Sequence, residues 1–328
     1  MNSNRRAVAK GLAGLALSSA LPVGLAQSDF PSKSIRLVVG YPPGGANDIT
    51  ARQVAQRLTE VLKVSVVVDN RAGANGLIGS DLVAKATPDG YTLLMGGLTP
   101  MVLNRLTYTK LPYNPDADLV GVSTVASSPI VFAVRPSLPV NNLADLVRLA
   151  KSKSDAVRFA TVGSGGSTRV VLEFLNQATG AGITYIPYKG AAPAITDILG
   201  GSVDGMGVDL PALLPFIKDG RLRGIAITSE TRNSLLPELR TAAEQGVPEL
   251  TCGNWYAVVA PARTPRAVLQ RLHVALQQVV ALPDFRQQTI AGGAEPRASA
   301  SIEAFASFQQ SELARWGKVI KIAGIEAE

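Results

Sequence analysis

The sequence contains only one cysteine, Cys252, and one histidine, His273, among 328 residues. A single cysteine cannot form an intramolecular disulfide, and this pair cannot supply the usual ligands of a zinc or copper site. Lys and Arg form no runs, and aromatic residues make up 5% of the chain, which argues against nucleic-acid binding. We therefore expect no metal, no cofactor and no nucleic-acid partner.

The first 26 residues have the pattern of an export signal. Arg5, Arg6 and Lys10 precede an apolar run, and the small residues that end this run suit cleavage near Ala26. The paired arginines also fit the twin-arginine route, so both export routes stay open, and an uncleaved anchor is the alternative. No later stretch is long enough to span a bilayer. Removal of the leader lowers the formal net charge from +7 to +4, because the leader holds these three cations and no acid. We expect a periplasmic protein that is compatible with anionic small molecules.

The rest of the chain alternates strand-like and helix-like patterns. Apolar residues at Ala51, Val54, Ala55, Leu58 and Leu62 follow helical spacing. A helix between two buried strands predicts a parallel βαβ unit, and its repetition predicts two α/β lobes. The predicted strands are 34–40, 64–69, 91–96, 129–135, 157–163, 183–188 and 223–228. The predicted helices are 47–63, 143–151, 168–178, 265–282 and 302–323.

Glycine-rich breaks follow three of the predicted strands. The first spans residues 41–48 and reads YPPGGAND, and residues 71–76 and 162–168 repeat the construction. Glycine permits close backbone approach, and either Asn47 or Asp48 can cap the first helix, which leaves other backbone N–H groups free. A helix N-terminus with free donors is a ready anion site, and α/β sheets bind ligands at this end of their strands. Ordinary turns are the alternative interpretation.

Catalytic motifs are absent from these breaks. None matches a phosphate-binding P-loop, a dinucleotide fingerprint or a nucleophile elbow. A serine hydrolase would have to combine Ser164 with His273, which lies beside the apolar face of a predicted helix and is better explained by packing. Asp204 and Asp209 could hold a hard cation or act as acid and base, whereas Asp209 could equally accept a hydrogen bond. We expect a protein that is not an enzyme.

Together these segments resemble the substrate-binding proteins of tripartite tricarboxylate transporters, also called the Bug family. The resemblance covers essentially the whole mature chain and implies a two-lobed α/β periplasmic-binding-protein fold of the Venus-flytrap, type II-like kind. Each lobe would be a mostly parallel sheet flanked by helices, with residues 27–126 and 229–328 in lobe 1 and residues 127–228 in lobe 2. The matching segments are 41–52, 70–79, 86–93, 111–113, 163–167, 187–194, 220–223 and 255–265.

The resemblance implies a monomer that captures a small carboxylate between its lobes and delivers it to an integral-membrane permease. A sensing partner of a signalling receptor and, with less support, an exported hydrolase are the alternatives. Arg169 stands where the family often has His and could reach the cleft or point outward; Asp209, if it faces the cleft, favours a ligand that carries a donor. The ligand-binding residues carried over from the family are Pro43, Gly44, Gly45, Asn47, Asp48, Ala74, Asn75, Gly76, Ser164, Gly165, Gly166, Ser167, Thr168, Tyr188 and Asp209.

Overall fold

The computed structural model describes residues 30–153 and 155–325, and the predicted export leader lies outside these residues. From Pro31 onward the described residues belong to one compact unit. Its strands follow the order β2-β1-β3-β9-β4-β7-β5-β6, and β8 and β10 also pair with β4. We call the part of the sheet that contains β2, β1, β3 and β9 the first half, and the part that contains β7, β5 and β6 the second half. β4 belongs to both.

The first half begins with the predicted βαβ unit. β1 (Ile35–Val39) pairs in parallel with β2 (Val66–Asn70) and β3 (Thr92–Gly97). α1 (Ala46–Leu62) buries the apolar face that the spacing predicts, and it ends at Lys63 in a left-handed conformation. α2 (Leu77–Ala84), a π-helical turn (Thr99–Leu103) and α3 (Asn104–Thr107) were not predicted.

The second half repeats the arrangement. β5 (Arg158–Val162) pairs in parallel with β6 (Thr184–Tyr188) and β7 (Gly205–Asp209). Each of these strands is followed directly by a helix, so the helix starts gather at the carboxyl edge of the strands. The helices of this half are α4 (Leu143–Ser152), α5 (Ser167–Thr179), α6 (Ala191–Leu199) and α7 (Leu210–Lys218).

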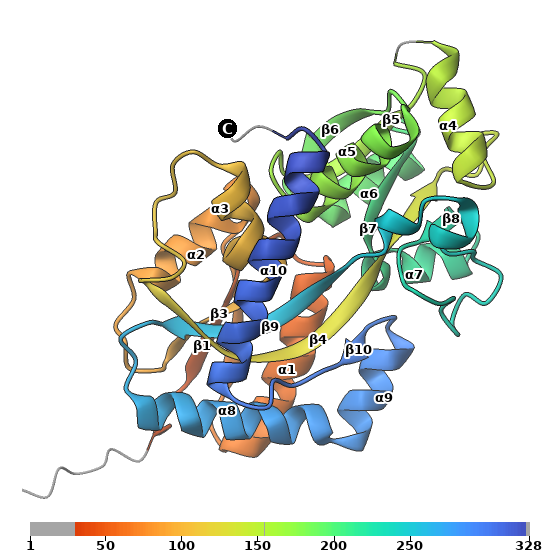
Figure 1. The fold of residues 1–328 in the computed structure, drawn as a ribbon. Coiled ribbons are helices and arrows are strands. Elements are labelled where there is room, and N and C mark those ends of the chain that lie inside the picture. The colour runs from red at the N-terminus through yellow and green to blue at the C-terminus, as the bar shows by residue number, and fades with distance from the viewer. Residues whose placement is uncertain (1–29, 154, 326–328) are drawn as a thin grey trace, which may run out of the picture. The chain divides into compact units, whose positions relative to one another are not determined.

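Two long antiparallel strands connect the halves (Figure 1). β4 (Leu119–Val134) pairs with β9 (Gly253–Pro261) up to Pro129, and from Ile130 it pairs with β7. β8 (Arg223–Ile227) lies against the same end of β4. The sequence predicted only residues 129–135 of β4, because Gly, Ser and Thr interrupt the apolar pattern before Pro129.

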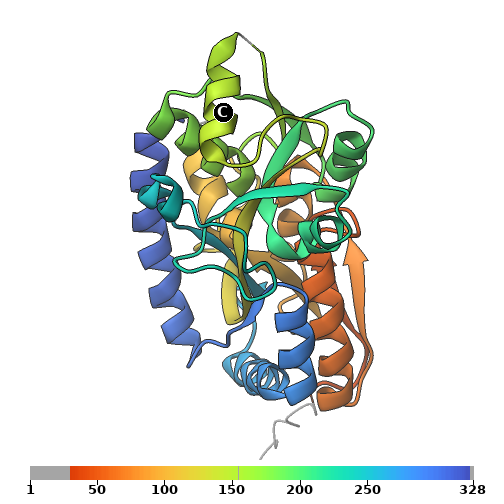
Figure 2. The ribbon, with the colours of Figure 1, turned by 90° about the vertical axis from the view of Figure 1, so that its right-hand side faces the viewer.

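The C-terminal helices pack mainly against the first half. α8 (Arg266–Ala281) contacts α1, and α10 (Ile302–Ile322) contacts β4 and α5, so it touches both halves. Figure 2 shows α1 and α10 on opposite sides of the strands. The Trp255 ring meets the Phe305 ring edge-on at 5.7 Å. The remaining elements are α9 (Pro283–Ala291), β10 (Glu295–Pro296) and 3-10 turns at Ala74–Gly76, Ala243–Gln245 and Pro248–Leu250.

Candidate functional site

Four helices begin beside one small cavity, and three of them have a glycine N-cap. The N-cap residues of α1, α5 and α6 are Gly45, Gly166 and Gly190, each with extended backbone and no side-chain capping bond. The first N–H groups of a helix have no intrahelical acceptor, so these helix starts present backbone donors and partial positive charge. Because the starts come from both halves, the cavity is lined by donors on two sides.

The start of α1 differs from the predicted cap. Neither Asn47 nor Asp48 is the N-cap; Asp48 lies in the first turn, where its Oδ2 accepts the Gly44 N–H at 3.0 Å. Burial alone would raise the pKa of Asp48, but hydrogen bonds from Arg52, the Gly44 amide and Asn70 outweigh it and hold the pKa below its usual value. Asp48 therefore stabilises the loop before α1 through the Gly44 amide and does not line the cavity.

The cavity has a volume of about 40 Å³. Of the predicted ligand residues, it brings together Gly45, Asn47, Asn75, Gly166, Ser167, Thr168 and Asp209. Among the described residues that line it, none is Lys, Arg or His. Sequence reasoning missed the remaining lining residues, which are Tyr41, Pro42, Ala46, Thr99, Val162, Ala191, Val208 and Asn254.

Asn75 reaches across from the first half to the second. Residues 73–76 all have positive φ, including Ala74 at 44° and Asn75 at 53°, and this left-handed turn points the Asn75 amide at the α5 loop. In the orientation that satisfies both amide atoms, its oxygen accepts the Gly166 N–H at 3.0 Å and its nitrogen donates to the Val162 carbonyl at 3.2 Å. Asn75 is therefore a polar contact between the two sides of the cavity.

Other contacts hold the same loops together. The Thr107 hydroxyl donates to the Gly165 carbonyl at 3.0 Å, and the Pro42 ring packs so closely on Gly190 that a Cβ there would lie 2.7 Å from Pro42 Cδ. Of the other predicted residues, Pro43, Gly44, Ala74, Gly76, Ser164 and Gly165 are outside the cavity lining. Several of them instead shape the loops that form the cavity.

Arg169 and Tyr188 also lie outside the lining. Arg169 Nη1 donates to the Ser164 carbonyl at 2.5 Å, and its guanidinium stacks 4.8 Å above the Tyr185 ring. The Tyr188 hydroxyl donates to Asp197 Oδ2 at 2.7 Å, and burial followed by this carboxylate raises the pKa of Tyr188 to about 12. Arg169 thus supports the loop at residues 162–168 from outside the cavity.

Asp209 is the ionisable carboxyl group of the cavity. It is the N-cap of α7 and is 6% exposed, and its Oδ2 accepts the Asn254 Nδ2–H at 3.2 Å. Its Oδ1 has no hydrogen-bond partner within the described chain. Burial raises the pKa of Asp209 to about 6, although the Asn254 amide and the nearby Tyr256 hydroxyl oppose the rise.

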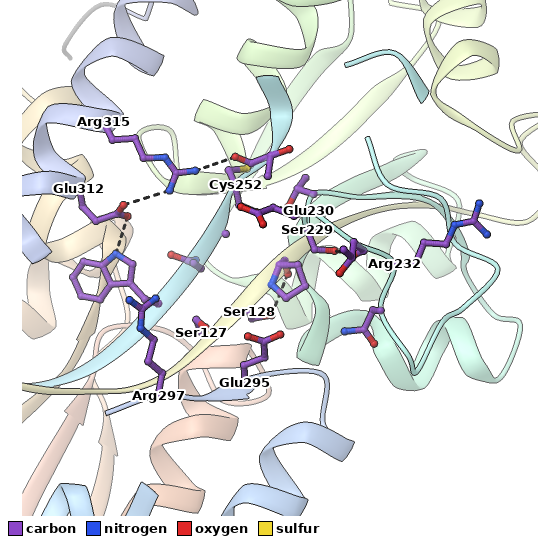
Figure 3. Close-up of a pocket in the computed structure, with 18 of the residues that line it drawn as sticks. Ser127, Ser128, Ser229, Glu230, Arg232, Cys252, Glu295, Arg297, Glu312 and Arg315 are labelled. Carbon is purple, nitrogen blue, oxygen red and sulfur yellow. Dashed lines mark hydrogen bonds and ion pairs between the residues drawn. The ribbon is translucent and has the colours of Figure 1, made fainter. Parts of the chain in front are cut away.

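A larger cavity of about 470 Å³ lies where β4 and β9 cross between the halves (Figure 3). Glu312 accepts the Trp255 indole N–H at 3.1 Å and pairs with Arg315 at 3.3 Å. Arg297 stacks on the Phe308 ring at 5.1 Å. None of the three glycine-rich breaks lines this cavity, and its three arginines are balanced by three glutamates, so the smaller cavity is the better candidate for anion binding.

The groups considered for catalysis lie elsewhere. His273 is buried in α8 with Nδ1 2.9 Å from the Val122 carbonyl oxygen, and it does not line the cavity beside Ser167. Burial raises the pKa of the Cys252 thiol to about 12. The part of the chain described by the structure contains no cluster of three or more His, Cys, Asp or Glu residues suited to a metal ion. Over residues 30–153 and 155–325, no helix has the length and apolar character needed to cross a bilayer.

Residues 50–325 match the model of the tripartite tricarboxylate transporter family receptor. The chain belongs to this family. It is 36% identical to protein BugT of Bordetella pertussis (strain Tohama I), an alignment that covers 99% of each chain. Family membership and the described fold confirm the predicted α/β periplasmic-binding-protein fold, and the family is one of binding proteins rather than enzymes.

Two solved structures show the closeness of the fold. Rpa4515 of R. palustris, solved with adipate, is 34% identical with a TM-score of 0.88 and covers 91% of this chain and 100% of its own. MatC of Rhodopseudomonas palustris, solved with bound malate, is 27% identical with a TM-score of 0.84 and covers 89% and 100%. The molecule in each of these two structures is a small dicarboxylate.

Proposed function

We propose that this protein captures a small carboxylate at the cavity between α1, α5, α6 and α7 and delivers it to a membrane permease of the tripartite tricarboxylate type. The observation that carries the proposal is the convergence of glycine-capped helix starts from both halves of the fold. Charge-assisted hydrogen bonds from such backbone donors each contribute about 1.5–3 kcal/mol. The adipate and malate in the structures of two family members support a dicarboxylate as the ligand.

The size of the cavity implies that capture involves movement. About 40 Å³ holds only a few water molecules, because each needs about 10–15 Å³ of such a cavity, and it is too small for a dicarboxylate. We propose that residues 27–126 and 229–328 form one lobe and residues 127–228 the other, and that the lobes move apart to admit ligand. Both boundaries fall near the connecting strands: residue 126 lies within β4, and residue 229 follows β8. The contacts of Asn75 and Thr107 across the cavity would then form as the lobes close.

Release to a permease requires that closure be reversible. Among the described lining residues no long cationic side chain has to be desolvated, because the polar groups of the lining are backbone amides, hydroxyls, side-chain amides and the Asp209 carboxyl group. A site of this kind can bind an anion and still exchange it when the lobes separate. We expect the mature protein to act as an exported monomer, with cleavage near Ala26.

A thermal-shift screen of protein beginning at Gln27 tests the proposal. The panel contains adipate, malate, citrate, acidic amino acids, aromatic acids and neutral amide analogues of the same length. A ligand at a hundred times its dissociation constant stabilises the fold by about 2.7 kcal/mol, which corresponds to roughly 5–10 °C for a chain of this size. We expect at least one carboxylate to produce such a shift while its neutral analogue does not. A sharp unfolding transition that no carboxylate moves would contradict the proposal.

A further inference from the structure

Asp209 places a carboxyl group where the proposed ligand carboxylate has to bind. Its side chain lines the cavity from the end of β7, where Asn254 from β9 donates to Oδ2. The Tyr256 hydroxyl of β9 interacts with the carboxyl group but makes no hydrogen bond within the described residues. Oδ1 is buried without a hydrogen-bond partner in the described structure. A buried acceptor without a partner is costly, so a ligand that supplies a donor to Oδ1 removes a cost already present in the protein.

Within residues 30–153 and 155–325, no positively charged side chain lines the cavity beside Asp209. The titratable groups that interact with it are Tyr41 from the first break, Tyr256 from β9 and Cys252 just before β9. Burial is the largest cause that raises the pKa of each of these three groups, so all are neutral near pH 7. The starts of α1, α5, α6 and α7 supply the positive potential at the cavity, and the pKa of Asp209 is nevertheless raised. Asp209 is therefore the group of this cluster that titrates near neutral pH.

An ionised Asp209 opposes binding of a second carboxylate. Two carboxylates about 3 Å apart in a buried site cannot both remain ionised, and such pairs retain one proton between them. Adipate carries no amine or hydroxyl, so a proton between it and Asp209 has to come from solution. The charges balance when one carboxylate of the protein, one carboxylate of the ligand and one proton give a single hydrogen-bonded pair with one negative charge.

We propose that Asp209 Oδ1 and one ligand carboxylate share a proton, so that capture of a dicarboxylate takes up one proton from solution. This inference rests on the proposed function and assigns a specificity-determining role to one residue of the same site. A ligand without a hydrogen-bond donor then binds beside Asp209 only together with a proton. Its affinity therefore falls as the pH rises. The backbone N–H groups at the helix starts then stabilise the remaining negative charge of the ligand by hydrogen bonds.

Calorimetric titration of the mature protein with adipate, in buffers of different ionisation enthalpy, measures the proton uptake. We expect close to one proton per adipate at pH 7.5. From a pKa near 6, the dissociation constant should rise about 50- to 100-fold between pH 6.5 and pH 8.5, where adipate itself stays fully ionised. In Asp209→Asn, which keeps the shape but cannot titrate, we expect no proton uptake and a dissociation constant that is constant over this range. Asp219→Asn changes an exposed residue at the other end of α7 and should keep the wild-type pH dependence.

The outcomes separate this inference from the proposed function. If adipate or malate binds to the wild type without proton uptake, the shared proton is refuted while carboxylate capture stands. Equal pH dependence in the wild type and in Asp209→Asn would also refute it, because another group would then be titrating. If none of the carboxylates in the panel binds to folded protein, both proposals are overturned together.

Discussion

Gly166→Ala adds one methyl group at the start of α5 and tests whether the closely packed loop there is required for binding. A Cβ on Gly166 would lie 2.7 Å from the Val162 carbonyl oxygen and 2.7 Å from the Asn75 side-chain amide. The first clash lies within one loop, whereas the second presses against the residue that reaches across the cavity. Overpacking of this kind costs about 1–3 kcal/mol. If that cost falls mainly on the conformation in which Asn75 contacts the loop, Gly166→Ala should raise the dissociation constant about 5- to 150-fold.

A double-mutant cycle separates the two clashes. In an Asn75→Ala background the second clash is absent, so Gly166→Ala should weaken binding by less than it does in the wild type, with a coupling of about 1 kcal/mol or more. Isothermal titration of the four proteins with the best carboxylate from the screen gives this coupling. Gly317→Ala in α10 is the matched control, because a Cβ at Gly317 would meet no neighbouring side chain within 4 Å; it should leave affinity unchanged and stabilise the helix by up to about 1 kcal/mol. Wild-type affinity in Gly166→Ala would refute the account of the loop.

Two further predictions concern the loops behind the cavity. Asp48→Ala leaves the Gly44 and Asn70 donors and Arg52 without their buried acceptor, so it should lower the free energy of unfolding by about 2–4 kcal/mol. Arg52→Gln should lower it by less than about 1 kcal/mol, because the Arg52 side chain is half exposed. Because the folded pKa of Asp48 lies below its ordinary 3.8, its contribution to stability is present above pH 3.8 and is lost as the pH falls further. The wild type should therefore lose stability more steeply than Asp48→Asn below pH 3.8, whereas their pH dependence should match above it; equal slopes below pH 3.8 would contradict this assignment. Ala74→Gly relieves a φ of 44° and should raise the melting temperature by about 1–4 °C, and a lower melting temperature would show that the turn is not strained.

The sequence predicts most of the fold because its patterns are local. The apolar face of α1 and the breaks at residues 41–48 and 162–168 depend on neighbours in the chain, and the structure has the corresponding helix starts at Gly45 and Gly166. The sequence predicted only part of β4, because residues 119–129 are stabilised by pairing with β9, more than one hundred residues away. No local apolar pattern indicates that pairing. The predicted lobe boundaries stay predictions.

The site was predicted less completely for a related reason. Tyr41, Pro42 and Ala46 adjoin the first break and could have been included from their position alone, and Ala191 follows a further strand-to-helix break at Gly190. Thr99 and Asn254 have no such local indication, because they reach the cavity only through the packing of a π-helical turn and of β9. The assignment of ligand contacts to individual residues remains a prediction.

The central claim is that helix starts from both lobes hold the ligand carboxylate. The most direct test is a crystal structure of the mature protein with adipate, or with the carboxylate that gives the largest thermal shift. Our account predicts a carboxylate within hydrogen-bond distance of backbone N–H groups at the start of α1 and of α5, directly or through one water, and next to Asp209. A ligand bound in the larger cavity between β4 and β9, or held at the small cavity by side chains alone, would contradict it.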